Sequence, residues 1–209
     1  MKEKGRLLVI SGFSGVGKGT VVKHMMREYP NYVLSVSATT RDPRNNEIPE
    51  VDYHYITNEE FEKMIKERQL LEYASYVDHY YGTPKEFVDT NIKEGNNVIL
   101  EIETQGAIQV KDNEPEVIMI FLLPPDAVTL KQRLIGRGTE TEEVIAKRLK
   151  KAAEETENMP YYEYFVINDE IDKCADNINK IVTGAQPDLP SKEQVSRIKN
   201  DILRFSKGE

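Results

Sequence analysis

The sequence contains no tryptophan, one cysteine and only three histidines in 209 residues. The single cysteine, Cys174, excludes a disulfide framework and a cysteine-based metal site. The histidines at positions 24, 54 and 79 are too scattered to suggest a metal site. Long apolar runs are also missing: none reaches the ~20 residues that a membrane-spanning helix needs. No secretory signal opens the chain. We therefore expect a cytoplasmic protein that makes no membrane contact.

Positive charge is scarce as well. The 36 acidic residues outnumber the 28 lysines and arginines, and the formal net charge is −8. Proteins that coat nucleic acids or anionic membranes carry the opposite balance, so neither is expected as a partner. Any phosphate group that the protein binds must therefore be held by local geometry and a few well-placed cations.

Short apolar runs alternate with amphipathic segments along most of the chain. Nearly continuous apolar residues predict buried strands at 6–11, 97–102, 117–123 and 164–168. Helical spacing of apolar residues predicts helices at 18–28, 84–94, 104–113, 126–136, 142–157 and 170–184. Strands that alternate with helices form right-handed crossovers. The predicted fold class is therefore α/β, a three-layer parallel-sheet core with helices on both faces.

Three segments depart from this alternation. Residues 35–83 contain polar, alternating and aromatic stretches such as VDYHYI, which predict a small antiparallel or mixed insert with one solvated face. The charged, glycine-bearing stretch 136–143 is typical of a mobile loop. After AQPDLP at 185–190, apolar residues again recur at helical spacing and predict a terminal helix; they are Val195, Ile198, Ile202 and Phe205.

The stretch GFSGVGKGT at 12–20 has the spacing of a phosphate-binding loop, because it follows a predicted strand and opens a predicted helix. Glycines let backbone N–H groups surround a polyphosphate such as that of ATP, and the helix adds its positive end. Lys18 is placed to reach the β- and γ-phosphates. The predicted loop residues are Gly12, Phe13, Ser14, Gly15, Val16, Gly17, Lys18, Gly19 and Thr20. Gly19 stands where many such loops carry a hydroxyl that contacts Mg²⁺, and Thr20 follows one residue later.

A second anion site is predicted in the insert. Arg41 and Arg44 lie three residues apart in TTRDPR. Two converging guanidinium groups suit a terminal phosphate or a carboxylate. Tyr53 and Tyr81 can add phenolic donors to the same anion. For any one of these residues the alternative, an ordinary solvated loop, stays open.

Taken together and in order, several stretches resemble guanylate kinase from about Leu7 to Val182; behind GFSGVGKGT they are SVSATTRDPR, VDYHYI, LLEYASYVDHYYGTP, NVILEIETQGA and RGTETEEVIAKRL. The resemblance implies an enzyme of purine nucleotide metabolism that moves the γ-phosphoryl group of MgATP onto GMP, and onto dGMP. It also implies a division into four parts. These are a core (1–34, 84–135 and 158–186), a GMP-binding insert (35–83), a helical lid (136–157) and a C-terminal extension (187–209).

The resemblance also implies roles for individual residues. The GMP phosphate would meet Arg41, Arg44, Tyr53 and Tyr81, and the guanine edge would meet Ser37, Glu72 and Thr83, with Glu47 nearby. Arg133, Arg137 and Arg148 would surround the transferring phosphoryl group together with Lys18 and Arg41, and Asn168 would lie near the adenine. Glu101 would act on the water shell of Mg²⁺, with Thr20 as a second candidate, and Glu103 would face GMP. The guanine assignment has a chemical basis, since an ionised Glu72 accepts from N1–H and the 2-amino group while Ser37 donates to O6.

The sequence departs from the family pattern in places. Asn46 and Glu50 stand where glycines are usual, and because asparagine tolerates a left-handed conformation we expect the loop to hold its shape. Glu103 replaces an aspartate, and we expect it to share one strand face with Glu101, towards the ATP loop. The tail beyond Gln186 lies outside the resemblance.

Two other functions are open at this point, and the oligomeric state is left as monomer or homodimer. Some guanylate-kinase-like domains are protein-binding scaffolds that have lost the ATP loop, whereas this chain keeps Lys18 and the lid arginines. A kinase of another small phosphate ester, such as a phosphorylated ribose, would not need a base-reading set such as Ser37, Glu72 and Thr83.

Overall fold

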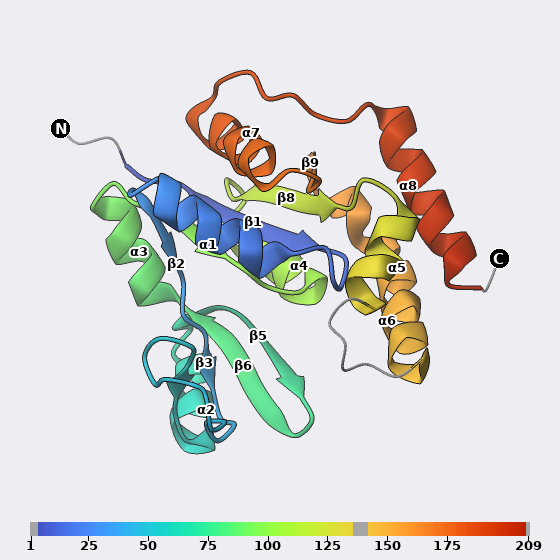
Figure 1. Ribbon diagram of the computed structural model, residues 1–209. Helices are drawn as coiled ribbons and strands as arrows, with labels where there is room; N and C mark the ends of the chain where they lie inside the picture. Colours follow the sequence, from blue (N-terminus) through green and yellow to red (C-terminus); the bar gives the residue numbers. More distant parts are fainter. Residues whose placement is uncertain (1–3, 136–141, 208–209) are drawn as a thin grey trace. The chain divides into compact units, whose positions relative to one another are not determined.

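The computed structural model describes residues 4–135 and 142–207 (Figure 1). The chain forms two compact units, one made of Met1–Val9 and Pro30–Val117 and the other of Ile10–Tyr29 and Ile118–Glu209. Strand β1 (Leu7–Gly12) contributes residues to both. The units do not follow the predicted division into core, insert, lid and extension, which remains a prediction.

In the first unit, β2 (Tyr32–Leu34), β7 (Asn97–Leu100) and the start of β1 form parallel strands in the order β2-β7-β1. Leu7, Leu8 and Val9 lie opposite Val98, Ile99 and Leu100. The strands expected at 6–11 and 97–102 are therefore present, but β7 ends at Leu100. The expectation that Glu101 and Glu103 share a strand face is wrong, because both follow the strand. β2 was not predicted, since three residues are too few to show a period.

A separate sheet in this unit has the strand order β4-β3-β6-β5. Its strands are β3 (Ala38–Thr39), β4 (His54–Tyr55), β5 (Leu70–Tyr76) and β6 (His79–Pro84). β5 pairs with β6 antiparallel, but β3 pairs with β4 parallel, so the insert is mixed rather than purely antiparallel. Val77 and Asp78, at φ 49° and 63°, make the tight turn between β5 and β6.

The insert also contains α2 (Asn58–Lys66), which we did not predict. Thr57 caps this helix: its side chain accepts from the Glu60 N–H, and the Glu60 carboxylate accepts from the Thr57 N–H at 2.8 Å. Phe61 is buried and stacks on Tyr80 with ring centroids 5.1 Å apart. A threonine followed three residues later by a glutamate is a recognisable helix-start signal. The strand-like alternation on both sides obscured it.

The loop before β4 contains a left-handed residue, and it stands at the second of the two positions where glycines are usual. Its left-handed residue is Glu50, at φ 65°, and not Asn46. The Glu50 N–H donates to the carbonyl of Tyr53 at 3.0 Å. This bond closes the turn, so the left-handed residue is fixed by the position of the turn rather than by the tolerance of asparagine.

Two helices complete the first unit. α3 (Lys85–Lys93) packs against β7, and α4 (Thr104–Asn113) packs against β5. Glu103 is the N-cap residue of α4. Both helices confirm the ranges expected from the apolar spacing to within a residue.

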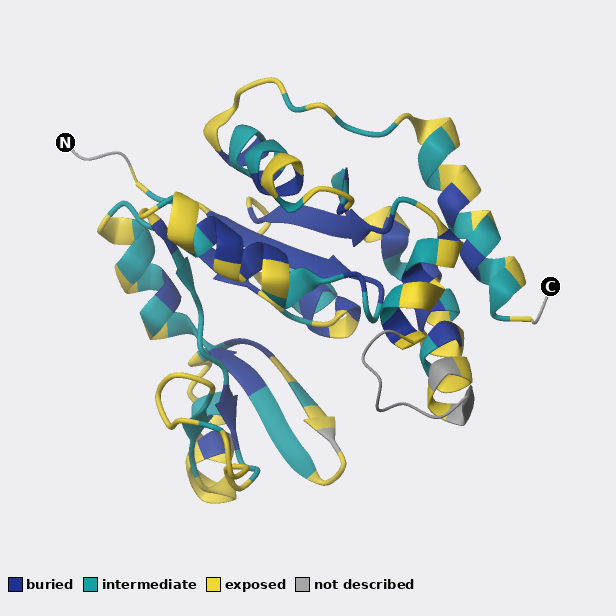
Figure 2. Ribbon diagram, in the orientation of Figure 1, coloured by how far each residue is buried: buried dark blue, intermediate teal, exposed yellow. Residues whose placement is uncertain are grey.

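In the second unit the strand order is β1-β8-β9, with β8 (Ile118–Leu123) parallel to β9 (Tyr164–Ile167). Every residue of β8 is buried (Figure 2), as its unbroken apolar run predicts. The helices of this unit are α1 (Lys18–Glu28), α5 (Ala127–Ile135), α6 (Glu142–Glu155), the 3-10 helix η1 (Thr156–Tyr161), α7 (Ile171–Thr183) and α8 (Lys192–Phe205). α1 packs against α7, and His24 Nε2 lies 3.0 Å from Asp172 Oδ1.

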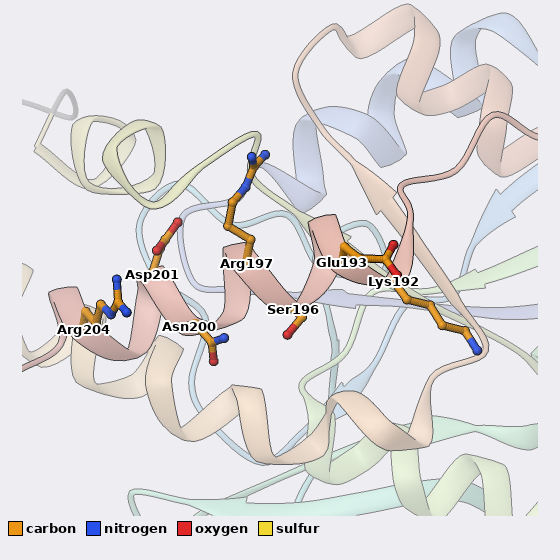
Figure 3. A pocket seen from close by; sticks show the side chains of 7 residues that line it. All are labelled: Lys192, Glu193, Ser196, Arg197, Asn200, Asp201 and Arg204. Atoms are coloured by element: carbon orange, nitrogen blue, oxygen red, sulfur yellow. The ribbon is translucent and has the colours of Figure 1, made fainter.

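The expected terminal helix is α8, and it packs against α5 and α6. Ile198 and Ile202 are buried, and the Lys131 ammonium lies 5.8 Å from the ring centroid of Phe205. A hollow of about 550 Å³ follows the polar side of α8 and is lined by Lys192, Glu193, Ser196, Arg197, Asn200, Asp201 and Arg204 (Figure 3). Arg197 and Asp201 point to one side of the helix and Ser196 and Asn200 to the other (Figure 3). Since these side chains do not converge, the hollow is not a candidate site.

Over the described part of the chain, none of the helices combines the length and the apolar character needed to cross a bilayer.

Candidate active site

The loop between β1 and α1 ends in a helix start that no side chain caps. Gly17 is the N-cap residue, at φ 98° and ψ 28°, and α1 begins at Lys18. Such a helix end directs backbone N–H groups and the positive end of the helix dipole at the same point. This arrangement binds phosphate groups.

Lys18 and Gly12 shape the interior of this loop. The Lys18 ammonium donates to the Gly12 carbonyl at 2.7 Å, so its long side chain folds back over the loop. A Cβ atom on Gly12 would lie 2.6 Å from the Leu122 carbonyl oxygen of β8. Only glycine allows the loop to leave β1 this close to β8.

Arg133 and Asn168 hold the loop from the end of α5 and from the end of β9. The Asn168 amide donates to the Val16 carbonyl at 2.8 Å, and Arg133 Nη1 donates to the same carbonyl at 3.1 Å. Arg133 also donates to the Asn168 carbonyl at 2.9 Å. A Cβ on Gly17 would come within 2.8 Å of the Asn168 amide. The structure thus brings these predicted residues together on the backbone of the loop.

Glu155, at the end of α6, is a contact that the sequence did not reveal. Its carboxylate is buried and accepts from the Ser14 N–H at 3.0 Å. The two residues are 141 positions apart, and nothing local in KKAAEETEN marks Glu155. Arg148 lies half-buried on α6. Arg137, the third predicted lid arginine, lies outside the described residues.

In the first unit, Arg41 forms a bidentate ion pair with Glu47. Arg41 Nη1 donates to Glu47 Oε2 and Nη2 to Oε1, both at 2.9 Å. The Arg41 guanidinium lies 5.4 Å from the ring centroid of Tyr53, and Tyr53 meets Tyr81 edge-on with ring centroids 6.0 Å apart. Three of the four residues expected at the GMP phosphate therefore lie together, whereas Arg44 is exposed and contributes its backbone N–H to Glu47 at 2.8 Å.

The charge state of Glu47 follows from this pairing. The Arg41 guanidinium, with the Arg44 N–H and the Tyr55 hydroxyl, lowers the pKa of Glu47 to about 2. Glu47 is therefore an anion at neutral pH and a partner of Arg41. The Tyr55 hydroxyl, which donates to Glu47 Oε2 at 2.8 Å, was not predicted. Its signal was present, because Tyr53 and Tyr55 are two apart in a strand-like stretch and lie on one face.

Glu72 and Thr83 form a buried hydrogen-bonded pair. The Thr83 hydroxyl donates to Glu72 Oε1 at 2.7 Å, and both residues are buried. Burial raises the pKa of Glu72 above its usual value, and the hydrogen bonds from Thr83 partly oppose this. A carboxylate that has lost its water gains strongly from any ligand N–H that reaches it. Ser37, half-buried, directly precedes β3, and its carbonyl accepts from the His54 N–H at 2.9 Å.

The residues predicted near Mg²⁺, and also Glu103, are exposed, in contrast to the buried Glu72–Thr83 pair. Glu101 and Glu103 are both exposed, the first after β7 and the second at the start of α4, and Thr20 is exposed in the first turn of α1. Within residues 4–135 and 142–207, no three His, Cys, Asp or Glu side chains form a group that could hold a metal ion.

A phosphate-binding loop between a parallel strand and a helix, with a lysine folded over it, defines a P-loop nucleotide-binding protein. The buried Glu72–Thr83 pair and the Arg41–Glu47 ion pair add polar groups in the first unit. Comparisons with known proteins then narrow the class. A sequence model described as guanylate kinase matches residues 4–185, and the chain belongs to the guanylate kinase family.

Individual relatives agree. The chain is 50% identical over 182 residues to the guanylate kinase of Oceanobacillus iheyensis, covering 87% of this chain and 88% of that protein. It is 46% identical over 209 residues to the guanylate kinase of Clostridium acetobutylicum, covering 100% and 97%. The crystal structure of guanylate kinase from Anaplasma phagocytophilum superposes with a TM-score of 0.67 at 30% identity, covering 88% and 87%. The tail lies beyond the family model but within the match to the Clostridium protein.

Proposed function

We propose that this chain transfers the γ-phosphoryl group of ATP to GMP, giving ADP and GDP, with dGMP as a second acceptor. The observation that carries the choice of acceptor is the buried Glu72–Thr83 pair. It supplies a desolvated carboxylate, which suits a base that presents two neighbouring N–H donors. dGMP is included because the proposed contacts reach the base and the phosphate rather than the sugar.

The ATP phosphates are assigned to the loop from Gly12 to Thr20. Backbone N–H groups at the start of α1 would bind them, and Lys18 would leave the Gly12 carbonyl for the β- and γ-oxygens. Asn168 is assigned to the adenine side. Three arginines are assigned the role of offsetting negative charge on the transferring phosphoryl group; they are Arg133, Arg137 and Arg148.

The acceptor is assigned to the first unit. Glu72 would accept from guanine N1–H and the 2-amino group, Ser37 would donate to O6, and Thr83 would hold Glu72 in place. Adenine offers neither N1–H nor a 2-amino group, so it would leave the buried carboxylate unpaired, and such mismatches discriminate strongly. The phosphate is assigned to Arg41, Arg44, Tyr53 and Tyr81, with Glu103 on the same side.

Mg²⁺ is proposed to accompany ATP. The candidate ligands in the chain, the Thr20 hydroxyl and the Glu101 carboxylate, are hard oxygen donors of the type that Mg²⁺ takes, and they are few because Mg²⁺ usually keeps waters and phosphate oxygens. When bound, the ion would offset negative charge on the ATP phosphates.

The chemistry needs little from the chain beyond position and charge. The nucleophile is a GMP phosphate oxygen that is already ionised at neutral pH, so no general base is required. Catalysis would come from in-line placement of the two substrates and from cationic side chains around the transferred group. A cytoplasmic location and a monomeric or homodimeric state remain predictions from the sequence.

The test is ADP release measured over a panel of nucleoside monophosphates and ribose 5-phosphate. We expect turnover with GMP and dGMP and little with AMP or CMP. Efficient phosphorylation of AMP, CMP or the sugar phosphate without GMP activity would overturn the proposal. Binding of GMP with no turnover of any acceptor would favour the scaffold alternative.

A further inference from the structure

Tyr55 is not among the residues assigned above to GMP, yet it contacts the group that holds Arg41. Its hydroxyl donates to Glu47 Oε2 at 2.8 Å. The same oxygen accepts from the Arg44 N–H at 2.8 Å and from Arg41 Nη1 at 2.9 Å. Two of these three bonds do not involve Arg41, so the carboxylate has anchors of its own. Glu47 therefore stands in a fixed place against which the guanidinium is set.

The way Glu47 meets Arg41 leaves one edge of the guanidinium available. A guanidinium presents two pairs of parallel N–H groups, one from both Nη atoms and one from Nε with an Nη atom. Glu47 occupies the first pair at 2.9 Å on each side. Arg41 Nε is buried and makes no hydrogen bond in the described part of the chain. Besides Glu47, the Tyr81 side chain, another residue assigned to the phosphate, lies close enough to the guanidinium to raise the Arg41 pKa. Because a buried unpaired N–H is costly, this edge is suited to an external acceptor.

Two tyrosine rings lie close to the Arg41 guanidinium. The Arg41 Cζ atom lies 5.4 Å from the ring centroid of Tyr53 and 6.0 Å from that of Tyr55. Tyr55 thus contacts the Arg41–Glu47 pair twice, by its ring and by its hydroxyl. A tyrosine hydroxyl is protonated at neutral pH, and burial and then the bond to Glu47 raise its pKa further. It is therefore a donor to an anionic carboxylate under all ordinary conditions.

We propose that Tyr55 is a positioning residue of the acceptor site, whose hydroxyl anchors Glu47 so that Arg41 presents its Nε edge to the phosphate of the bound nucleotide. The inference rests on the proposed function for the identity of that nucleotide. In this arrangement Glu47 orients Arg41 and does not compete with the phosphate. Tyr55 acts through Glu47 and Arg41 and touches neither substrate.

Tyr55→Phe is the direct test, because it keeps the ring beside Arg41 and removes only the hydroxyl. We expect KM for GMP to rise about 3- to 10-fold, the effect of one lost hydrogen bond, with kcat and KM for ATP nearly unchanged. Affinity for guanosine, which has no phosphate, should stay the same. The matched control is Tyr80→Phe, since Tyr80 makes its contacts through its ring and backbone. The control should change none of these constants.

A double-variant cycle separates positioning from general loosening of the insert. In a Glu47→Ala background, Tyr55→Phe should add little to the loss of GMP affinity, because the oxygen that accepts from Tyr55 is already gone. Additive losses, or an equal loss of guanosine and GMP affinity, would overturn the proposal. So would an unchanged or lowered KM for GMP in Tyr55→Phe, since a lowered KM would mean that Glu47 competes with the phosphate.

One measurement tests the anchor without any substrate. The carboxyl carbon of Glu47, followed by NMR as pH is lowered, should titrate near a pKa of about 2 in the native protein and higher in Tyr55→Phe. If this shift is found but GMP is not phosphorylated, the proposed function fails while the anchor stands. If GMP is phosphorylated and the titration does not move, the anchor is wrong.

Discussion

At the scale of single residues, the Glu72 carboxylate is a group whose burial costs the first unit stability. Burial raises its pKa, which means that the native state disfavours its charged form. The bond from Thr83 recovers only part of the lost hydration. On the proposed assignment the missing donors arrive with GMP, so this position gives up stability in favour of recognition.

Glu72→Gln should therefore act in opposite directions on binding and on stability. Glutamine places an amide donor against a guanine N–H, and a buried unpaired group costs about 1–3 kcal/mol, so kcat/KM for GMP should fall roughly 5- to 150-fold. At neutral pH the same change removes a desolvated charge, so the melting temperature of the ligand-free protein should rise. Steady-state kinetics and calorimetry measure the two effects. Unchanged selectivity for GMP over AMP would show that Glu72 does not read the base.

The raised pKa of Glu72 also predicts a pH dependence. Guanine recognition needs the ionised form, so kcat/KM for GMP should fall as pH drops through a value above the ordinary 4.5 of a glutamate. Titration of the GMP phosphate overlaps this range, and Glu72→Gln is the control because it keeps only the substrate's contribution. An identical profile for both proteins would contradict the assignment.

The sign for stability is opposite to that of a salt-bridged acid. Because the native state holds the Glu72 proton more tightly than the unfolded state, stability falls as pH rises from about 4.5 through the raised native pKa. The stability gained in Glu72→Gln should therefore be largest above that window and vanish below it.

At the scale of elements, the packing of α4 against β5 depends on a glycine, Gly106, which has no side chain. A Cβ on Gly106 would lie 2.7 Å from Glu72 Oε2 and 3.2 Å from its Cδ. Glycine inside a helix costs about 1 kcal/mol relative to alanine. The position therefore forgoes helix stability to leave room for the carboxylate.

Gly106→Ala tests which effect is larger. Moving a buried carboxylate that is held by Thr83 at 2.7 Å should cost about 1–3 kcal/mol, as overpacking does, and exceed the helix gain. We expect KM for GMP to rise roughly 5- to 150-fold by the same range, with KM for ATP unchanged. Gln105→Ala, at an exposed position one residue earlier in α4, is the matched control. A variant that is simply more stable, with native GMP kinetics, would show that Glu72 can move freely.

At the scale of the whole molecule, local signals predicted most of what was found. The continuous apolar runs predicted β1, β7, β8 and β9, and α1 runs from Lys18 to Glu28 as its apolar spacing predicts. The P-loop was predictable because its glycines, its lysine and the helix that follows are consecutive. β2 and α2 were missed, the first because it has three residues and the second because alternation around it favoured strands.

Contacts between distant residues were the part that the sequence could not supply. Glu155 reaches Ser14 across 141 positions, and no local pattern sets this pairing. Arg41 pairs with Glu47, which also accepts from Tyr55, and the sequence predicted Glu47 only as a residue near GMP, without these partners. Residue types therefore predicted the chemistry of the candidate site, while its hydrogen-bond partners depended on tertiary packing.

The C-terminal helix α8 buries apolar side chains against the rest of its unit. Ile198 and Ile202 of α8 are each 1% exposed, and α8 packs against α5 and α6. Burying two such side chains contributes about 1.5–3 kcal/mol each, a large share of a typical total of about 5–15 kcal/mol. Arg133 on α5 is held independently by the carbonyls of Val16 and Asn168. The tail is thus expected to support stability more than catalysis.

Truncation after Gln186 should therefore lower the melting temperature by roughly 6–24 °C, taking about 2–4 °C per kcal/mol for a chain of this size. At 25 °C the GMP kinase activity should stay within about threefold of the full chain, because the P-loop contacts of Arg133 do not pass through α8. Ile198→Ala should reproduce part of the loss, and Ser196→Ala, on the exposed side of the same helix, should not. Size-exclusion chromatography adds the decisive control. A truncated protein of unchanged stability that changes from dimer to monomer would show that α8 covers a second copy of the chain rather than its own unit.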